Sequence, residues 1–317
     1  MSLNPFVADA QIRARIEALA AEIGPTVNEE VSERLRARRH DVSQNLGSVL
    51  LAAEVREIVA DFGLASPEEL MLLILPTAQT LASPPISSFF VGSVGLEAQT
   101  GNLVLGGNVE FPQTHLGFTL HGEGFVFTRA YSRGTAIAKI AIGEAHPCAH
   151  CRQYLSEFAA TKDLRLIDPL GHDLTMAQLY PWPFDPAYLG EPGARPEAMP
   201  WPDLSLSAAH PAAEKLLATG RRAHTPYSKS PSAIVLTLRD GATVCGASIE
   251  SVAFNPTIGP LQAAIVDLLA HGYNYDDIES AVLGTVRGGP VDYAKSVTEL
   301  LGAIAPAAKL DILGWTI

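Results

Sequence analysis

The chain repeats one order of predicted elements on either side of a proline-rich segment. That order is strand, strand, helix, strand, with a turn at Gly101-Asn102 in the first half and at Asp240-Gly241 in the second. In the first half we predict strands over residues 89–93, 103–105, 137–142 and 164–167. In the second half we predict strands over 233–238, 243–249 and 281–286, and a helix over 261–270. Alternating strands and helices indicate layered α/β domains, so the repeat predicts two domains of one fold.

A helical front and an extended linker complete the predicted organisation. Apolar residues recur at helical spacing behind a candidate N-cap at Asp9, and Ser66-Pro67 is typical of a later helix start, so the front is expected to be all-helical. Six prolines lie between Tyr180 and Pro202, a density that excludes a helix or a central strand. The expected parts are an N-terminal helical segment (1–65), a first α/β domain (66–179), a linker (180–204) and a second α/β domain (205–317).

Charge and cysteine content restrict the class of protein. The net charge of −12 repels phosphate backbones, so we expect no nucleic acid partner. The uncharged stretch 70–96 contains prolines and scattered polar residues, so it is expected to form buried core and not a membrane span. Three cysteines favour a thiol or metal site in a reducing compartment, and no secretory signal is visible, so a cytoplasmic location is expected.

The residues that indicate chemistry are His121 and Glu123, followed by Cys148 and Cys151 after Pro147. Each part alone is a weak signal, because a Cys-x-x-Cys pair also occurs in redox sites and structural zinc knuckles. Together they match H-x-E followed by P-C-x-x-C, the signature of zinc deaminases. Three protein ligands would leave one tetrahedral position open for water, whereas a structural zinc site needs four.

The sequence allows more than one role for several residues near this motif. His146 and His150 are candidates for a fourth ligand, although the position of each makes that reading a minor one. Arg152 is equally compatible with a supporting hydrogen bond and with an exposed helix charge. Cys245 lies in the second half and is expected to be a small buried side chain unrelated to the metal.

Further segments give the chain a resemblance to cytidine deaminases of the two-domain, homodimeric bacterial type. These segments are 106–111, 147–153, 226–231 and 253–257. The resemblance extends over roughly 66–317 and implies a three-layer α/β cytidine deaminase-like fold, in which a catalytic domain precedes a degenerate, non-catalytic copy. In the second half, Gly259-Pro260-Leu261 replaces the His121 to Glu123 triplet, and no Cys-x-x-Cys follows.

The resemblance also implies roles for individual residues. It implies Zn²⁺ on His121, Cys148 and Cys151, with Glu123 as the general acid and base. It implies that Asn108 and Glu110 bind the ribose, that Phe89 and the Gly122 N–H contact the pyrimidine, and that Phe184 reaches into the partner's pocket. The expected reaction is hydrolytic deamination of cytidine, and of deoxycytidine, in pyrimidine salvage. The expected assembly is a homodimer with no membrane partner.

Three residues depart from the family's pattern, namely Gly122, Gly124 and Ala145. Glycines at the first two positions loosen the start of a helix, so the departures bear on rate and substrate choice. Two alternative functions stay open from the sequence. One is a related zinc deaminase that acts on another base or nucleotide. The other is a noncatalytic zinc protein that binds nucleosides, against which the retention of Glu123 argues.

Overall fold

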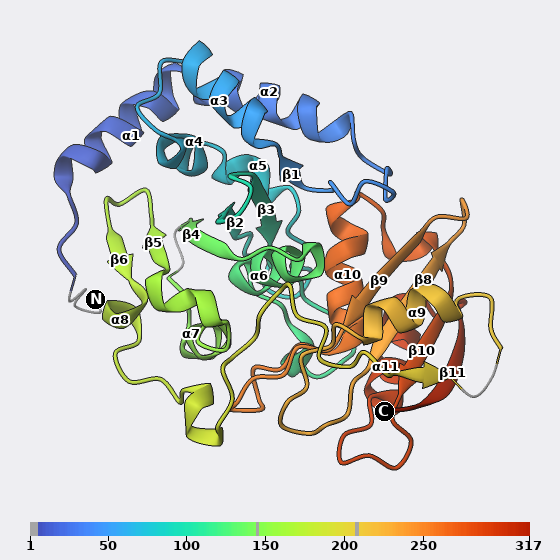
Figure 1. Ribbon diagram of the computed structural model, residues 1–317. Helices are drawn as coiled ribbons and strands as arrows, with labels where there is room; N and C mark the ends of the chain where they lie inside the picture. Colours follow the sequence, from blue (N-terminus) through green and yellow to red (C-terminus); the bar gives the residue numbers. More distant parts are fainter. Residues whose placement is uncertain (1–5, 144–145, 207–208) are drawn as a thin grey trace.

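Two mixed β-sheets form the framework of the computed structural model, which describes residues 6–143, 146–206 and 209–317 (Figure 1). The first sheet has the order β1-β3-β2-β4-β5-β6 and the second the order β7-β11-β10-β8-β9. The strands of the first sheet are β1 (Val49–Leu50), β2 (Gly92–Glu97), β3 (Leu103–Gly107), β4 (Ile137–Ile142), β5 (Arg165–Ile167) and β6 (Asp173–Thr175). Those of the second are β7 (Ser205–Leu206), β8 (Ala233–Leu238), β9 (Thr243–Ala247), β10 (Ile278–Thr285) and β11 (Lys309–Thr316).

Each sheet contains a unit of four strands, and the two units have the same order and strand directions. β2 pairs antiparallel with both β3 and β4, and β4 pairs parallel with β5. In the second sheet β8 pairs antiparallel with both β9 and β10, and β10 pairs parallel with β11. The predicted repeat of one α/β fold is therefore confirmed at the level of strand order and direction.

Helices cover both faces of each sheet. The helices are α1 (Ala10–Glu22), α2 (Gly24–Arg36), α3 (Ala52–Asp61), α4 (Pro67–Leu73), α5 (Leu75–Gln79), α6 (Gly122–Arg133), α7 (Ala149–Leu155), α8 (Met176–Leu179), α9 (Ala213–Gly220), α10 (Pro260–Ala270) and α11 (Ala294–Ile304). Short 3₁₀ turns are η1 (Leu116–Phe118), η2 (Ala159–Asp163), η3 (Pro186–Leu189) and η4 (Tyr275–Asp277).

Alternating strand residues divide the interior into three hydrophobic clusters. Leu103 and Leu105 of β3 pack with the N-terminal helices, whereas Val104 between them faces the central cluster that contains α6 and α10. In β8, Ile234 belongs to the central cluster and Val235 to the cluster under α9. Five layers result: N-terminal helices, first sheet, central helices, second sheet and α9. Figure 1 shows α6 and α10 adjacent at the middle of the molecule.

A buried ion pair joins the two central helices. Arg129 of α6 is fully buried, and its Nη1 lies 2.8 Å from Oδ1 of Asp267 in α10. Nε and Nη2 of Arg129 also donate to the Gly47 carbonyl at 3.2 Å. The pair connects the two halves of the chain at the centre of the fold.

The N-terminal segment agrees with the prediction except at β1. The Asp9 side chain caps α1 by accepting from the N–H groups of Gln11 and Ile12, and α4 begins at Pro67 as expected. The expectation of an all-helical front is wrong, because residues 49–50 form β1 and pair antiparallel with β3. A strand of two residues is too short to show an alternating pattern in the sequence. β1 forms because β3 offers a sheet edge with which residues 49–50 can pair.

Two further expectations are corrected. The strand predicted over 89–93 begins at Gly92, and Phe89 lies in the preceding loop. The prediction also omitted β6, β7, α9, α11 and β11. The stretch 70–96 is core, as expected, over α4 and α5, and no helix among the described residues is long and apolar enough to span a bilayer.

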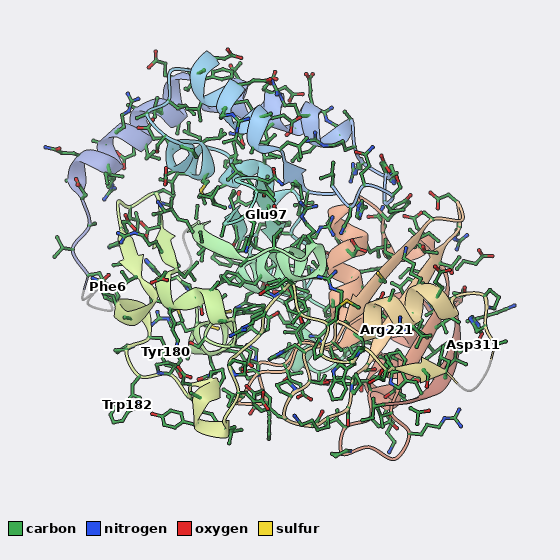
Figure 2. The ribbon with its side chains drawn as sticks, viewed as in Figure 1. Phe6, Glu97, Tyr180, Trp182, Arg221 and Asp311 are labelled. Carbon is green, nitrogen blue, oxygen red and sulfur yellow. The ribbon has the colours of Figure 1, made fainter. Side chains whose placement is uncertain are left out.

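The linker over 180–204 follows the surface and contains the single short turn η3 among its regular elements. Trp182 is 81% exposed and lies at the outer edge of the molecule (Figure 2). Trp201 instead packs against the cluster under α9, and its Nε1 donates to the Ala223 carbonyl.

Candidate active site

The N-terminal ends of α6 and α7 place the predicted metal ligands side by side. His121 is the N-cap of α6, Cys148 is the N-cap of α7, and Cys151 lies in the first turn of α7. Nδ1 of His121 lies 3.2 Å from Sγ of Cys151 and 3.6 Å from Sγ of Cys148, and the two sulfurs are 3.5 Å apart. Residues thirty positions apart in the chain therefore meet because both helices begin at the same edge of the sheet.

The spacing of these three atoms fits a zinc ion. Zn–S and Zn–N bonds of about 2.3 and 2.0 Å in a tetrahedron place one nitrogen and two sulfur ligands roughly 3.5–3.8 Å apart, close to the observed 3.2–3.6 Å. One imidazole and two thiols also form a donor set that zinc prefers. Among the described residues, this group contains no fourth His, Cys, Asp or Glu. The arrangement is that of a site with one position left for water.

The two histidines considered as a fourth ligand have other partners. Nε2 of His150 lies 3.1 Å from the carbonyl oxygen of Asn255, in the second half of the chain. Nε2 of His146 lies 2.9 Å from Oδ2 of Asp168. Arg152 donates to the carbonyls of Pro147 and Leu179, so it supports the loop before Cys148 and is not a free surface charge.

The electrostatics of the ligand group favour metal binding. Hydrogen bonds with Cys151 and His121 lower the pKa of the Cys148 thiol to about 3. The helix start at which Cys148 lies favours its thiolate as well. A hydrogen bond with Cys148 raises the pKa of His121. Binding of a metal would therefore displace protons held within this group.

Glu123 occupies the first turn of α6, two residues after His121. Glu123 is 4% exposed, and this burial raises the pKa of its carboxyl group. A carboxyl group with a raised pKa exchanges protons nearer to neutral pH. Glu123 is therefore a buried carboxyl group close to the predicted ligands, with its pKa shifted toward neutral pH.

Asn108 and Glu110 hold the loop that carries Phe89. Glu110 accepts from the N–H groups of Ile86 and Ser87 at 2.9 and 2.8 Å, and from the Ser87 hydroxyl at 2.5 Å. Asn108 accepts from the Val91 N–H at 2.9 Å and donates to the Phe89 carbonyl at 2.8 Å. Both side chains thus shape the 84–91 loop that precedes β2.

The second half repeats the contacts of Glu110 without the metal ligands. Glu250 accepts from the N–H groups of Tyr227 and Ser228 and from the Ser228 hydroxyl. At the start of α10, Gly259 and Leu261 replace the histidine and glutamate. Because the copy keeps the loop contacts and has lost the metal-binding residues, fixing this loop is a structural task of the carboxylate in both halves.

Phe89 and Phe184 are both accessible. Phe89 is 51% exposed at the tip of the 84–91 loop, and Phe184 is 42% exposed in the linker. The ring of Phe184 stacks on Tyr188 with centroids 5.7 Å apart, and the Phe184 backbone exchanges hydrogen bonds with Gln153 of α7.

The two unusual glycines differ in their surroundings. A Cβ atom at Gly122 would lie 2.4 Å from Oγ of Ser93, whereas one at Gly124 would meet nothing within 4 Å. Ser93 is fully buried, so its hydroxyl occupies the space that an alanine at 122 would need. Ala145, the third departure, lies outside the described residues.

Sequence reasoning missed two features of the site. Asp168 and His172 join His146 in a second compact group, although His146 lies 22 positions before Asp168 and the three residues match no motif. A cavity of about 180 Å³ behind the ligands is lined by His121 and Cys151 from one half and by Pro256 and Ile258 from the other. The second half thus forms part of the wall of the site.

Comparisons with known proteins agree with this geometry. Residues 65–165 and 197–297 each match a model of the cytidine and deoxycytidylate deaminase zinc-binding region. The cytidine deaminase of Vibrio atlanticus (strain LGP32) is 30% identical over 298 residues, which cover 93% of this chain and 97% of that protein. The cytidine deaminase of Shewanella baltica (strain OS155) is 32% identical over 237 residues, 75% of this chain and 79% of that protein. The crystal structure of cytidine deaminase from Mycobacterium leprae is 28% identical and covers 36% of this chain and 98% of that one, with a TM-score of 0.33.

Proposed function

The chain belongs to the family of cytidine and deoxycytidylate deaminases, and from this premise we propose that it is a zinc-dependent hydrolase that converts cytidine to uridine and ammonia. The observation that carries the proposal is the convergence of His121, Cys148 and Cys151, with a buried carboxyl group two residues from the histidine. We extend the substrate class to deoxycytidine, and place the reaction in pyrimidine salvage.

His121, Cys148 and Cys151 would hold the zinc through Nδ1 and the two sulfurs. Zinc bound there supplies the lowered pKa of a water molecule, which makes a nucleophile available near neutral pH. Glu123 accepts the proton of that water and delivers it to N3 of the pyrimidine while C4 is attacked. Glu123 then takes the remaining proton from the water oxygen now bonded to C4 and passes it to the amino group, which leaves as ammonia while C4 becomes the carbonyl carbon of uridine, so that one carboxylate acts as base and as acid.

The remaining predicted residues would bind and orient the nucleoside. Asn108 and Glu110 present an amide and a carboxylate suited to ribose hydroxyls, and each retains hydrogen-bonding capacity beyond its contacts with the 84–91 loop. Phe89, exposed at the tip of that loop, offers an aromatic face to the base. The N–H of Gly122, in the first turn of α6, is suited to the pyrimidine carbonyl.

The active unit is proposed to be a homodimer in which Phe184 closes the pocket of the partner. Support comes from the linker, where Trp182, Phe184 and Tyr188 are 81, 42 and 62% exposed. Aromatic side chains gathered on one exposed segment are typical of an interface. We also propose a cytoplasmic location, because none of the three cysteines forms a disulfide, and the domain limits 66–179 and 205–317, which overlap the two matched regions.

Ammonia release from cytidine, deoxycytidine, cytosine and adenosine tests the proposal directly. Zinc-loaded protein should release ammonia from the two cytosine nucleosides and not from adenosine. The zinc-loaded Glu123→Gln variant serves as the control for traces of contaminating enzyme. Zinc-containing protein that releases ammonia from none of the four compounds would overturn the function, and would instead favour a noncatalytic nucleoside-binding protein.

A further inference from the structure

We infer that Asp168 is a positioning residue that holds His146, and through it the loop that carries Cys148. The inference rests on the proposed zinc site. Oδ2 of Asp168 lies 2.9 Å from Nε2 of His146, and His146 is followed directly by Pro147 and Cys148. None of the side-chain hydrogen bonds found for Asp168 among the described residues reaches a predicted metal ligand, so its connection to the site runs through His146.

Asp168 is itself firmly held. It is 2% exposed and follows β5 at the point where this strand lies parallel to the end of β4. Its Oδ1 accepts from the N–H groups of Leu170 and His172 at 2.9 and 3.0 Å, and Nδ1 of His172 lies 2.7 Å from Oδ2. Three of the four side-chain contacts found for Asp168 among the described residues therefore close the turn between β5 and β6. The fourth, with His146, reaches another segment.

Arg152 provides a second anchor for the segment from His146 to Cys148. Nε of Arg152 donates to the Pro147 carbonyl at 2.8 Å, and Nη1 donates to the Leu179 carbonyl at 2.6 Å. The proline also restricts the backbone of His146 to extended conformations. The backbone before Cys148 thus has one anchor on Asp168 and one on Arg152, and these two anchors fix the direction from which its sulfur approaches the site.

The same three residues, His146, Asp168 and His172, are of types that bind metals. The distances favour a group held together by hydrogen bonds and not by a metal ion. Nitrogen and oxygen are 2.7 and 2.9 Å apart here, within the usual range of hydrogen bonds. In the zinc site, by comparison, the ligand atoms lie 3.2–3.6 Å apart. Two imidazoles that donate to one buried carboxylate oxygen account for the arrangement without an ion.

The expected consequence is a change in how firmly zinc is held. Residues that support metal ligands contribute about 10–100-fold to metal affinity or activity. Without its anchor, the Cys148 segment samples more orientations, so the metal should leave faster. We expect His146→Ala to increase the rate of zinc transfer to a chromogenic chelator by about 10-fold.

The test compares zinc release from purified, zinc-loaded variants whose melting temperatures are measured alongside. His146→Gln should release zinc at nearly the wild-type rate, because its amide nitrogen can donate to Asp168. His210→Ala is the matched control, since His210 faces Asp311 at 3.5 Å in the second half, far along the chain from the zinc ligands. His146→Ala combined with Asp168→Asn should release zinc no faster than the faster single variant.

Any one of the following results would overturn the inference. The first is wild-type zinc release from His146→Ala. The second is additive effects of the two substitutions. The third is two zinc ions per chain in the wild-type protein, which would make the group a metal site. Zinc-loaded protein without deaminase activity would overturn the proposed function alone, because the release assay does not depend on turnover, whereas protein unable to bind zinc would overturn both.

Discussion

Glu123 is one of several buried carboxylates among the described residues, and it lies beside the three predicted metal ligands. The residue is 4% exposed, and burial raises the pKa of its carboxyl group. An isolated buried carboxylate is costly unless it has a partner or a function. Its second-half counterpart in the chain is Leu261, which is buried as well. The site therefore keeps a polar group where the copy has an apolar one.

The substitution Glu123→Gln should remove the proton carrier and leave the shape of the side chain almost unchanged. We expect kcat to fall by about 10²–10⁴-fold, as is typical for loss of a general acid or base. Zinc content and melting temperature should stay near those of the wild type. Turnover close to wild type in the zinc-loaded variant would contradict the role given to Glu123.

The substitution Cys148→Ala should abolish tight zinc binding, because two remaining ligands cannot hold zinc as three do. Elemental analysis after dialysis should find about one zinc per chain in the wild type and far less in the variant. The matched control is Cys245→Ala, since Cys245 lies in β9 of the second half. Equal zinc content in Cys148→Ala and the wild type would exclude Cys148 as a ligand.

At the scale of single elements, the stability of the first turn of α6 depends on the close contact between Gly122 and the side chain of Ser93. Gly124 is buried with nothing near its missing Cβ, while Gly122 lies against the Ser93 hydroxyl of β2. Ser93 Oγ has no hydrogen-bond partner among the described residues. A helix that begins with two glycines loses about 0.5–1 kcal/mol at each relative to alanine.

Alanine substitutions at the two glycines should consequently behave differently in urea unfolding. Gly124→Ala should raise the free energy of unfolding by about 0.5–1 kcal/mol, because the new methyl group meets nothing. Gly122→Ala should give no such gain, since its methyl group meets Ser93. Adding Ser93→Ala should restore the gain. Equal stabilisation by both single substitutions would show that Ser93 does not restrict this position.

At the scale of the whole molecule, the contact between the two halves contains buried charges. Glu157, which follows α7, is fully buried and accepts from the Tyr227 hydroxyl and the Val252 N–H at 2.7 Å, and His224 lies equally close. In the centre, Arg129 faces Asp267. Each of these groups has a partner in the other half, so the degenerate half supports the segment that follows the cysteine-bearing helix.

The pair of Arg129 and Asp267 should make stability depend on acid pH. Burial alone would raise the pKa of Asp267, but the charge of Arg129 and the hydrogen bond of His271 more than offset this, and the pKa is lowered. A lowered pKa in the folded state means that the stabilisation is present above the unfolded pKa of about 3.9 and is lost as the pH falls below it.

Urea unfolding between pH 3 and pH 7 checks this dependence. Asp267→Asn should be less stable at pH 7 by about 3–5 kcal/mol, because Arg129 is left buried and unpaired. The difference between variant and wild type should shrink as the pH falls below about 4. A difference that stays constant over this range would show that the charge of Asp267 is not the stabilising feature.

We predict that each active-site pocket contains residues from both chains of the proposed dimer. Glu123→Ala and Phe184→Ala subunits should each be inactive, the first without its proton carrier and the second without the ring that closes the partner's site. Mixed dimers would contain one pocket with both residues intact, so activity should partly return after subunit exchange. Exchange demonstrated by mass spectrometry with no return of activity would contradict the shared pocket.

Sequence patterns of short range determined the chemistry and the repeated fold. His121, Glu123, Cys148 and Cys151 are recognisable because ligand spacing and helix starts are local properties of a chain. The strands 137–142 and 233–238 were placed at their observed limits, since apolar runs between turns also need no knowledge of partners.

Tertiary structure decided the features that depend on distant partners. Residues 49–50 become a strand only beside β3, and Phe89 leaves the predicted strand because Asn108 and Glu110 hold its loop. The contact of His146 with Asp168 joins segments that only the parallel pairing of β4 and β5 brings together. Such contacts follow from sheet order and helix packing, which combine residues with no shared local pattern, so no window of the sequence contains them.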